Sequence, residues 1–306
     1  MLKVDTGLDV VTGAFSYSGR AIADRLVAAG RSVRTLTGHP SRRPPGSAVS
    51  IAPLVFDDPD ALAESLRGVT TLYNTYWVRF AHGDVDHDVA VANSTALFGA
   101  AHAAGVQRIV HVSITNPSVD SPYAYFRGKA LVENALATSG VPHAILRPAI
   151  LFGGDGVLLN NIAWLLRHVP VFAVGGDGRY RIRPIHIDDL AALAVEASTW
   201  AGNATVDAVG PERPTFRELI ESIRSAVGSR SLVVPVPHLV IPLVSRLVDV
   251  ALRDVLLTGD EYWAMVDGLA DTDAPATGTT AVSTWLADNR NRLGRSYANE
   301  LERHFR

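Results

Sequence analysis

The 306-residue chain contains no cysteine. It therefore forms no disulfide, and it has no thiol nucleophile, no zinc site with cysteine ligands and no thiolate-bound iron–sulfur cluster. An excess of basic charge is also missing, because the formal net charge is -3 at pH 7. Proteins that bind phosphate backbones carry clustered Lys and Arg. The sequence thus excludes cysteine-based chemistry and argues against nucleic acid as a partner.

Long apolar runs are absent as well. The N-terminus reads Met-Leu-Lys-Val-Asp, with an acid where a signal peptide would continue its apolar segment. The most apolar late stretch, residues 232–257, contains three prolines and four charged side chains, so it lacks the roughly 20 apolar residues that a membrane helix needs. We interpret it as an amphipathic helix of a lid or lobe, with a role at a membrane surface as the alternative. We expect a cytoplasmic protein without stable membrane insertion, either a monomer or a homodimer.

The first half of the chain alternates short apolar runs with segments of helical periodicity. Gly30, Gly105 and Gly140 each end a helical segment shortly before the next run, at the position that a left-handed C-terminal cap prefers. This repeated unit predicts an α/β fold with a doubly wound parallel sheet (Rossmann) covered by helices on both faces. The expected strands are 10–12, 33–36, 51–54, 71–74, 108–112 and 143–146.

The regular alternation of short apolar runs and helical segments ends after residue 153. A helix is expected over 158–167, a strand over 180–187, a helix capped by Asp188 and Asp189, and a strand over 204–209, followed by mainly helical sequence. We therefore predict an NAD(P)-binding domain formed by residues 1–150 and 182–210. A smaller, mainly helical substrate lobe, formed by residues 151–181 and 211–306, is expected to close over the C-terminal edge of the sheet.

A glycine-rich turn connects the first expected strand to the first expected helix. Glycines there let the backbone approach a pyrophosphate, whose charge is met by the helix N-terminus. A strand, this turn, a helix and a second strand within about 30 residues form the context that the motif requires. We expect the turn to hold a dinucleotide; a tight turn without a ligand is the alternative. The expected contacts are Gly13, Phe15, Ser16 and Gly19.

The segment after the second expected strand indicates which dinucleotide binds. A site for NAD carries an acid about 20 residues beyond the glycine turn, where it binds the ribose 2′-hydroxyl. Residues 34–43 contain no acid. Thr37, His39 and Arg42, with Arg43 and Arg20 as further candidates, suit a 2′-phosphate, because guanidinium groups match its oxygens. We predict NADP, with NAD as the other cofactor that the site would take; a solvated basic loop is the alternative without a ligand.

A serine, a tyrosine and a lysine have the spacing of a proton-transfer site. Ser113 ends an expected strand, at the edge where open α/β sheets bind ligands, and Tyr125 and Lys129 lie four residues apart on one helix face. The ammonium would favour the phenolate, whereas a free phenol, with a pKa of about 10, exchanges protons poorly at neutral pH. We predict that Tyr125 is the acid/base and that Lys129 supports its ionisation. Tyr123 is an alternative phenol, without a lysine four residues later.

These motifs resemble the short-chain dehydrogenase/reductase superfamily. Gly13 and Gly19 match its G-x-x-G-x-x-G pattern, with Ser16 in place of the middle glycine. The resemblance implies that Ser113 orients the substrate oxygen and that Lys129 also binds the nicotinamide ribose. It further implies roles for three other residues: Asp57 at the adenine, Pro148 at the cofactor and Asn93 near a catalytic asparagine.

The resemblance extends to a branch of that superfamily. Residues 146–148 with Phe152-Gly153, and residues 183–189, resemble segments of its extended and atypical members. These include the nitrogen-metabolite-repressor-like proteins and the dehydrogenase-like accessory subunit of respiratory complex I. The branch contains reductases, sensors and structural subunits. It implies either hydride transfer to or from a small carbonyl or alcohol, epimerase and dehydratase chemistry included, or a dinucleotide-binding protein without turnover.

Three other patterns in the sequence have simpler explanations or remain open. Residues 82–88 gather two histidines and three carboxylates, which suits a divalent metal, but an Asp before a helix is explained by capping, and we expect no metal site. Serine hydrolase chemistry lacks its Gly-x-Ser-x-Gly elbow. Tyr76, Trp77 and Arg79 follow the fourth strand and either border the nicotinamide pocket or simply pack.

Overall fold

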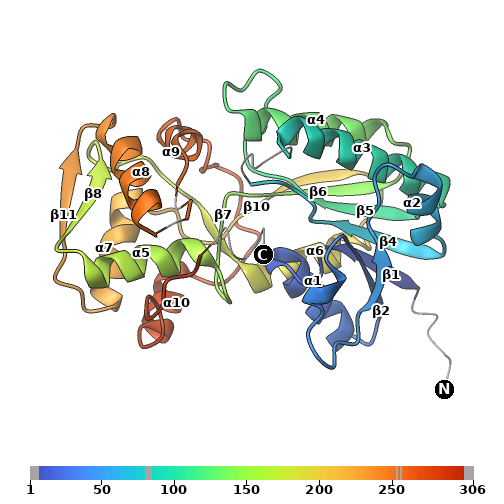
Figure 1. Ribbon diagram of the computed structural model, residues 1–306, viewed down its shortest axis with the longest axis horizontal. Helices are drawn as coiled ribbons and strands as arrows, with labels where there is room; N and C mark the ends of the chain where they lie inside the picture. The colour runs from blue at the N-terminus through green and yellow to red at the C-terminus, as the bar shows by residue number, and fades with distance from the viewer. Residues whose placement is uncertain (1–6, 80–84, 253, 256, 300–306) are drawn as a thin grey trace. The chain divides into compact units, whose positions relative to one another are not determined.

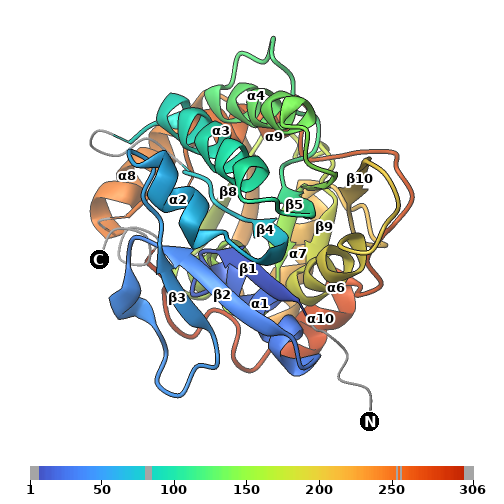
Figure 2. The same cartoon turned by 90° about the vertical axis from the view of Figure 1, so that its right-hand side faces the viewer.

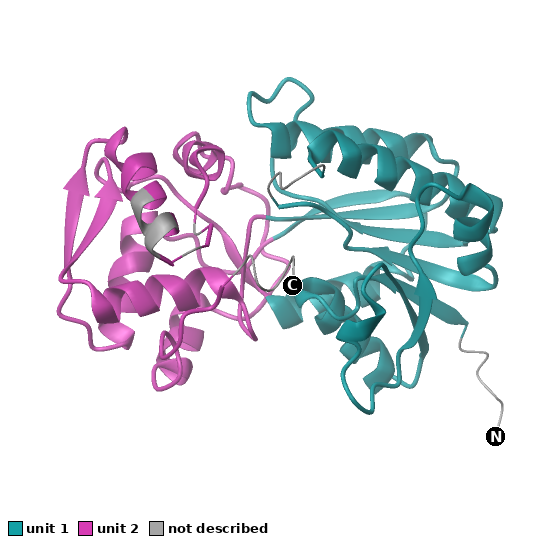
Figure 3. Ribbon diagram, in the orientation of Figure 1, with its two compact units in different colours: residues 1–148, 187–208 teal, residues 149–186, 209–306 magenta. Residues whose placement is uncertain are grey.

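The computed structural model describes residues 7–79, 85–252, 254–255 and 257–299. The chain divides into two compact units (Figure 3). Unit 1 comprises residues 1–148 and 187–208, and unit 2 comprises residues 149–186 and 209–306. Unit 1 is therefore discontinuous in sequence, because the chain leaves it after residue 148 and returns for its last helix and strand.

Unit 1 is built on a seven-stranded parallel sheet with the order β10-β6-β5-β4-β1-β2-β3 (Figure 1). From β1 the chain proceeds outward through β2 and β3, and then crosses back to β4, so the point between β1 and β4 is the topological switch of the sheet. The predicted doubly wound fold is confirmed. The strands are β1 Leu8–Thr12, β2 Ser32–Thr37, β3 Ser50–Pro53, β4 Val69–Asn74, β5 Arg108–Val112, β6 His143–Pro148 and β10 Ala204–Ala208.

Helices cover both faces of this sheet. On one face α1 (Tyr17–Ala28) packs against α6 (Ile187–Ala197), and on the other α3 (His87–Ala103) lies between α2 (Pro59–Ser65) and α4 (Ala124–Thr138), as Figure 2 shows. The central strands β1, β4, β5 and β6 are largely apolar because both of their faces are buried. The core between the sheet and the second helix layer includes Val10, Leu36, Leu72, Leu97 and Ile109, all fully buried.

Local signals explain where these helices begin and end. Gly30, Gly105 and Gly140 follow α1, α3 and α4 with φ between 73° and 76°, the left-handed conformation expected of them. Asp58 and Asp86 cap α2 and α3 by accepting the amides of Ala61 and Val89, each at 2.9 Å. The expectation for α6 needs a correction. Asp188 and Asp189 lie inside its first turn, not before it, where their charge suits the helix dipole.

Unit 2 is mainly helical and contains two small parallel ribbons, β7 (Ile150–Phe152) with β9 (Pro184–His186) and β8 (Val171–Gly175) with β11 (Leu232–Val236). Its core includes Leu159, Ile162, Leu219, Ile220 and Ile223. The helices are α5 Val157–His168, α7 Phe216–Ala226, α8 Val240–Leu252, α9 Gly259–Val266 and α10 Val282–Asn289.

Two expectations for this unit were wrong in part. The strand expected over 180–187 is limited to β9, and the first residues of the helix expected over 232–257 form β11. Residues 232–236 contain three β-branched valines. Among the described strands β11 pairs only with β8, so Pro235 is tolerated on an edge strand. Within the described residues, none of the helices is both apolar and long enough to cross a membrane.

Candidate functional site

The glycine turn adopts the strand-to-helix geometry that its sequence predicts. Gly13 has a φ of +65°, and its amide donates to the Leu36 carbonyl at 3.2 Å, which ties the turn to β2. The Ser16 amide and hydroxyl both donate to the Gly13 carbonyl, at 2.8 and 2.6 Å. Ser16 is the N-cap residue of α1, and Phe15 beside it is half-buried. The turn therefore places the N-terminus of α1 next to the switch point, where an anion is favoured.

Gly19 is required by close packing. A Cβ atom at this position would lie 2.2 Å from the Gly13 carbonyl oxygen, a backbone atom that cannot move aside. This is the contact for which dinucleotide-binding turns need their last glycine, because α1 passes close to β1. The sequence match at Gly13 and Gly19 thus has a physical cause in the structure.

Gly19→Ala is expected to lower the free energy of unfolding by about 1 to 3 kcal/mol, because the added methyl group forces the turn apart. Gly99→Ala is the matched control, since Gly99 is an exposed helical glycine with open space around its Cβ position. That control should gain about 0.5 to 1 kcal/mol from helix propensity. Urea denaturation of both variants measures the difference. Equal stabilities would contradict the packing role of Gly19.

A buried polar network joins the ends of three central strands. The Thr12 hydroxyl accepts the amides of Thr75 and Tyr76, at 2.8 and 3.0 Å, and lies 3.1 Å from the Asn74 side-chain oxygen. The Asn74 amide nitrogen lies 3.1 Å from His111 Nδ1. Burial lowers the pKa of His111 well below its ordinary value, so the ring is neutral. The network fixes the backbone that follows β4 against the start of the glycine turn.

Lys129 is buried at the C-terminal end of β5. It is 3% exposed, and its Nζ donates to the Val112 carbonyl at 2.9 Å and lies 4.5 Å from the centroid of the Trp77 ring. Burial lowers the pKa of Lys129 to about 7, and the negative charge of Glu133 offsets part of that effect. The ammonium and the neutral amine are therefore both populated at neutral pH, which suits a group that takes part in proton transfer.

Ser113 follows Val112 at the end of β5, and its side chain contacts Glu133, an acid that the sequence did not single out. Its amide donates to the Leu146 carbonyl at 2.7 Å, and its hydroxyl donates to Glu133 Oε1 at 2.5 Å. Arg147, near the end of β6, binds both oxygens of the same carboxylate. Pro148 ends that strand, and its carbonyl accepts the Thr115 amide at 3.0 Å. Two strand ends and α4 thus meet around Ser113.

Tyr125 is half-buried among aromatic rings. The rings of Trp77, His87 and Phe126 have centroids 5.6, 5.7 and 5.7 Å from that of Tyr125. Trp77 and His87 also stack on each other at 5.7 Å. Trp77 therefore contacts both Tyr125 and Lys129. His87, one of the two histidines of the segment 82–88, packs against the rings of Trp77 and Tyr125.

The remaining sequence candidates occupy other positions. His82 and Asp84 lie outside the described residues, and in the part of the chain that is described no three His, Asp or Glu side chains gather as metal ligands. Asn93 donates to the Tyr76 hydroxyl at 2.8 Å on the neighbouring loop. Asp57 is exposed, immediately before the capping Asp58.

The basic loop after β2 is held by hydrogen bonds between its own residues. The His39 amide donates to the Thr37 hydroxyl at 2.9 Å, and a short 3₁₀ helix, Pro40–Arg42, follows. Arg43 donates to the Ser47 carbonyl of its own loop at 2.7 Å. His39 is exposed and Arg42 half-buried, and both lie in the segment that follows β2, the strand paired with β1.

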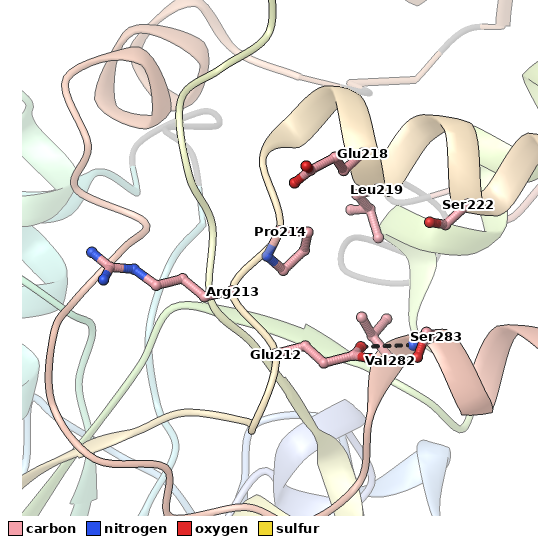
Figure 4. A pocket seen from close by; sticks show the side chains of 8 residues that line it. All are labelled: Glu212, Arg213, Pro214, Glu218, Leu219, Ser222, Val282 and Ser283. Carbon is pink, nitrogen blue, oxygen red and sulfur yellow. Dashed lines mark hydrogen bonds between the residues drawn. The ribbon is translucent and has the colours of Figure 1, made fainter.

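A separate cavity of about 340 Å³ lies in unit 2, lined by residues from the α7 and α10 regions (Figure 4). Its charged groups already have partners within the protein. Glu212 accepts the Ser283 amide at 2.8 Å, Arg213 binds Asp271, and Glu218 completes the cap of α7 with Thr215. This cavity contains none of the predicted site residues.

Comparison with known proteins supports the dinucleotide site. Residues 13–161 match the family model described as NAD(P)H-binding. The match covers slightly less than half of the chain. The Arabidopsis thaliana protein named NADH dehydrogenase (ubiquinone) 1 alpha subcomplex subunit 9, mitochondrial, is 27% identical over 226 residues, which cover 69% of the present chain. They cover 56% of that relative, so the chain matches little more than half of its length.

Solved structures show the same fold. The Citrobacter sp. triphenylmethane reductase complexed with NADP(H) is 18% identical, with a TM-score of 0.73, and the match covers 93% of this chain and 99% of that one. The Escherichia coli NADPH-dependent quinone oxidoreductase complexed with NADPH is 20% identical, with a TM-score of 0.71, and covers 94% and 99%. The predicted Rossmann fold is thus confirmed, and the family match of residues 13–161 supports NAD(P) as its cofactor.

Proposed function

We propose that the protein is an NADP-dependent oxidoreductase that acts on a small carbonyl or alcohol. The observation that carries this proposal is the position of Ser113 and Lys129, which lie at the C-terminal end of β5 with Tyr125 on the same helix as the lysine. This strand end lies one strand away from the switch point, at the edge of the sheet where ligands bind. A bound dinucleotide supplies or accepts the hydride.

The chain's own residues would handle the proton. Tyr125 donates it to the carbonyl oxygen as the alcohol forms, and takes it back in the reverse direction. The ammonium of Lys129 favours the phenolate by its charge and is held in place by the Val112 carbonyl. The rings of Trp77 and His87 pack edge-on against the phenol ring and hold it in place.

The test is NADPH consumption by the purified protein against a panel of aldehydes, ketones and quinones, followed by absorbance at the nicotinamide band. The proposal expects turnover with at least one member. It also expects no turnover when the dinucleotide is omitted. NADPH binding without turnover of any member of the panel would reject the oxidoreductase assignment.

A second candidate is a dinucleotide-binding protein without turnover, either a sensor or an assembly subunit. It is favoured by the Arabidopsis relative, which is named as a subunit of NADH dehydrogenase. The same panel separates the two proposals, because a sensor binds NADPH and leaves it unchanged.

NADPH is expected to bind at least tenfold more tightly than NADH, since the end of β2 lacks an acid and Arg42 lies near it. Arg42→Ala should weaken NADPH binding about tenfold and leave NADH binding unchanged. Arg43→Ala removes the same charge from a side chain held by the Ser47 carbonyl and is the matched control. Titration of intrinsic fluorescence measures all Kd values. Tighter binding of NADH to the wild type would overturn the cofactor preference.

A further inference from the structure

Glu133 is the third member of a stripe on α4. Tyr125, Lys129 and Glu133 are spaced four residues apart, which places them along one side of the helix. Lys129 and Glu133 both contact the end of β5, through the Val112 carbonyl at 2.9 Å and the Ser113 hydroxyl at 2.5 Å. Glu133 therefore reaches the same strand end as the groups of the proposed proton transfer.

Arg147 fixes the position of this carboxylate from the neighbouring strand. Its Nε donates to Glu133 Oε1 at 3.0 Å and its Nη2 to Oε2, a bidentate pair. The hydrogen bond to Glu133 raises the pKa of Arg147. Glu133 is 7% exposed, so its oxygens are held by protein groups. A carboxylate clamped in this way presents one oxygen to Ser113 in a fixed direction.

The direction of the Ser113–Glu133 hydrogen bond determines what Ser113 offers to a ligand. An ionised carboxylate accepts hydrogen bonds and donates none, so the proton between the two oxygens belongs to Ser113. Their separation of 2.5 Å is typical of a hydroxyl bound to a carboxylate. The hydroxyl is thus engaged as a donor, and only its lone pairs remain for another group.

We propose that Glu133, held by Arg147, is a positioning residue that fixes the Ser113 hydroxyl as a hydrogen-bond acceptor for the reacting groups. This inference rests on the proposed function. Ser113 then accepts a hydrogen bond from the hydroxyl of the alcohol or of Tyr125. A carbonyl oxygen accepts its hydrogen bond from Tyr125 alone. Removal of the carboxylate frees the serine to rotate, which impairs the reaction while the glycine turn between β1 and α1 is unaffected.

The experiment is a double-mutant cycle on Ser113→Ala and Glu133→Gln in the full chain, with the substrate identified by the panel. Each single change should lower kcat about tenfold or more, with the Kd for NADPH within about twofold of wild type. The double variant should be no slower than Ser113→Ala, because Glu133 acts only through the serine. If Glu133→Gln does not fold, Glu133→Gln with Arg147→Gln removes both charges of the pair and takes its place.

Asp9→Asn is the control for a purely structural ion pair. Asp9 is fully buried and is bound by the fork of Arg31, in the same unit. This variant should lose stability and keep the wild-type kcat. Additive losses in the double variant, or an unchanged kcat in Glu133→Gln, would overturn the positioning role while leaving the oxidoreductase proposal intact. A wild-type protein without turnover would overturn both.

Discussion

Tyr125→Phe is expected to lower kcat by about 100-fold or more while leaving the Kd for NADPH unchanged, because it removes the proton carrier alone. The phenylalanine ring keeps the contacts with Trp77, His87 and Phe126, which involve the face and edge of the ring. The change therefore tests the hydroxyl without disturbing the packing. Steady-state NADPH oxidation with the substrate from the panel gives kcat, and fluorescence titration gives the Kd.

Tyr123→Phe is the matched control for this prediction. Tyr123 is also half-buried, stands before the first turn of the same helix, and contacts the ring of Phe126 at 6.3 Å. The residue four positions later is Arg127, whose guanidinium donates to the Ser121 carbonyl. Tyr123→Phe should keep full activity. If it lost activity while Tyr125→Phe kept it, the acid/base role would belong to Tyr123.

Lys129→Met is expected to abolish turnover and, at the same time, to stabilise the protein without nucleotide. The pKa of Lys129 is about 7 in the folded protein and 10.5 ordinarily, so the unfolded chain binds more protons between these pH values. Holding the charge in the fold costs at most about 5 kcal/mol below pH 7. The contact with Trp77 and the hydrogen bond to Val112 offset part of this cost. We therefore expect the free energy of unfolding of Lys129→Met to exceed that of the wild type by about 2 kcal/mol at pH 6.

The stability difference between Lys129→Met and the wild type should depend on pH. The contribution of Lys129 to the free energy of unfolding rises with pH above 7, so the advantage of Lys129→Met should shrink by about 1 kcal/mol per pH unit and vanish near pH 9. Urea denaturation at pH 6, 7, 8 and 9 measures the difference. Arg67→Met, which removes an exposed cation paired with Glu64, should show no such trend. A Lys129→Met variant less stable than wild type at pH 6 would contradict the cost of the buried charge.

The sequence predicted the sheet of unit 1 well because its central strands are buried and therefore largely apolar, and because glycine marks three helix ends. Gly13 and Gly19 could be selected for the same reason, since their role depends on backbone geometry within a short segment. Unit 2 was harder to predict. The strands of β8 and β11 are partly exposed and pair with each other across more than fifty residues, so neither has a local pattern that separates it from a helix or a loop.

The candidate site shows the same limit. Ser113, Tyr125 and Lys129 could be selected from their spacing, and the NADP-selecting role of Arg42 stays a prediction. Glu133 lies four residues after Lys129, but an acid on a helix is usually a solvated one, and only its pairing with Arg147 and Ser113 distinguishes it. His111 is the penultimate residue of the buried strand β5, and a polar residue at such a position is a signal that could have indicated the network with Asn74 and Thr12.

The discontinuity of unit 1 has a consequence for how the chain reaches its fold. During synthesis the first six strands of the sheet emerge by residue 148, but β10, which pairs with β6, and α6, which covers α1, are made only after β7–β9. Until then β6 has an unpaired backbone edge and α1 an uncovered apolar side. An open edge of this kind is a template for association with other chains. A fragment ending at residue 161, where the family match stops, would retain both exposed surfaces, so the minimal folding unit of the dinucleotide domain extends to residue 208.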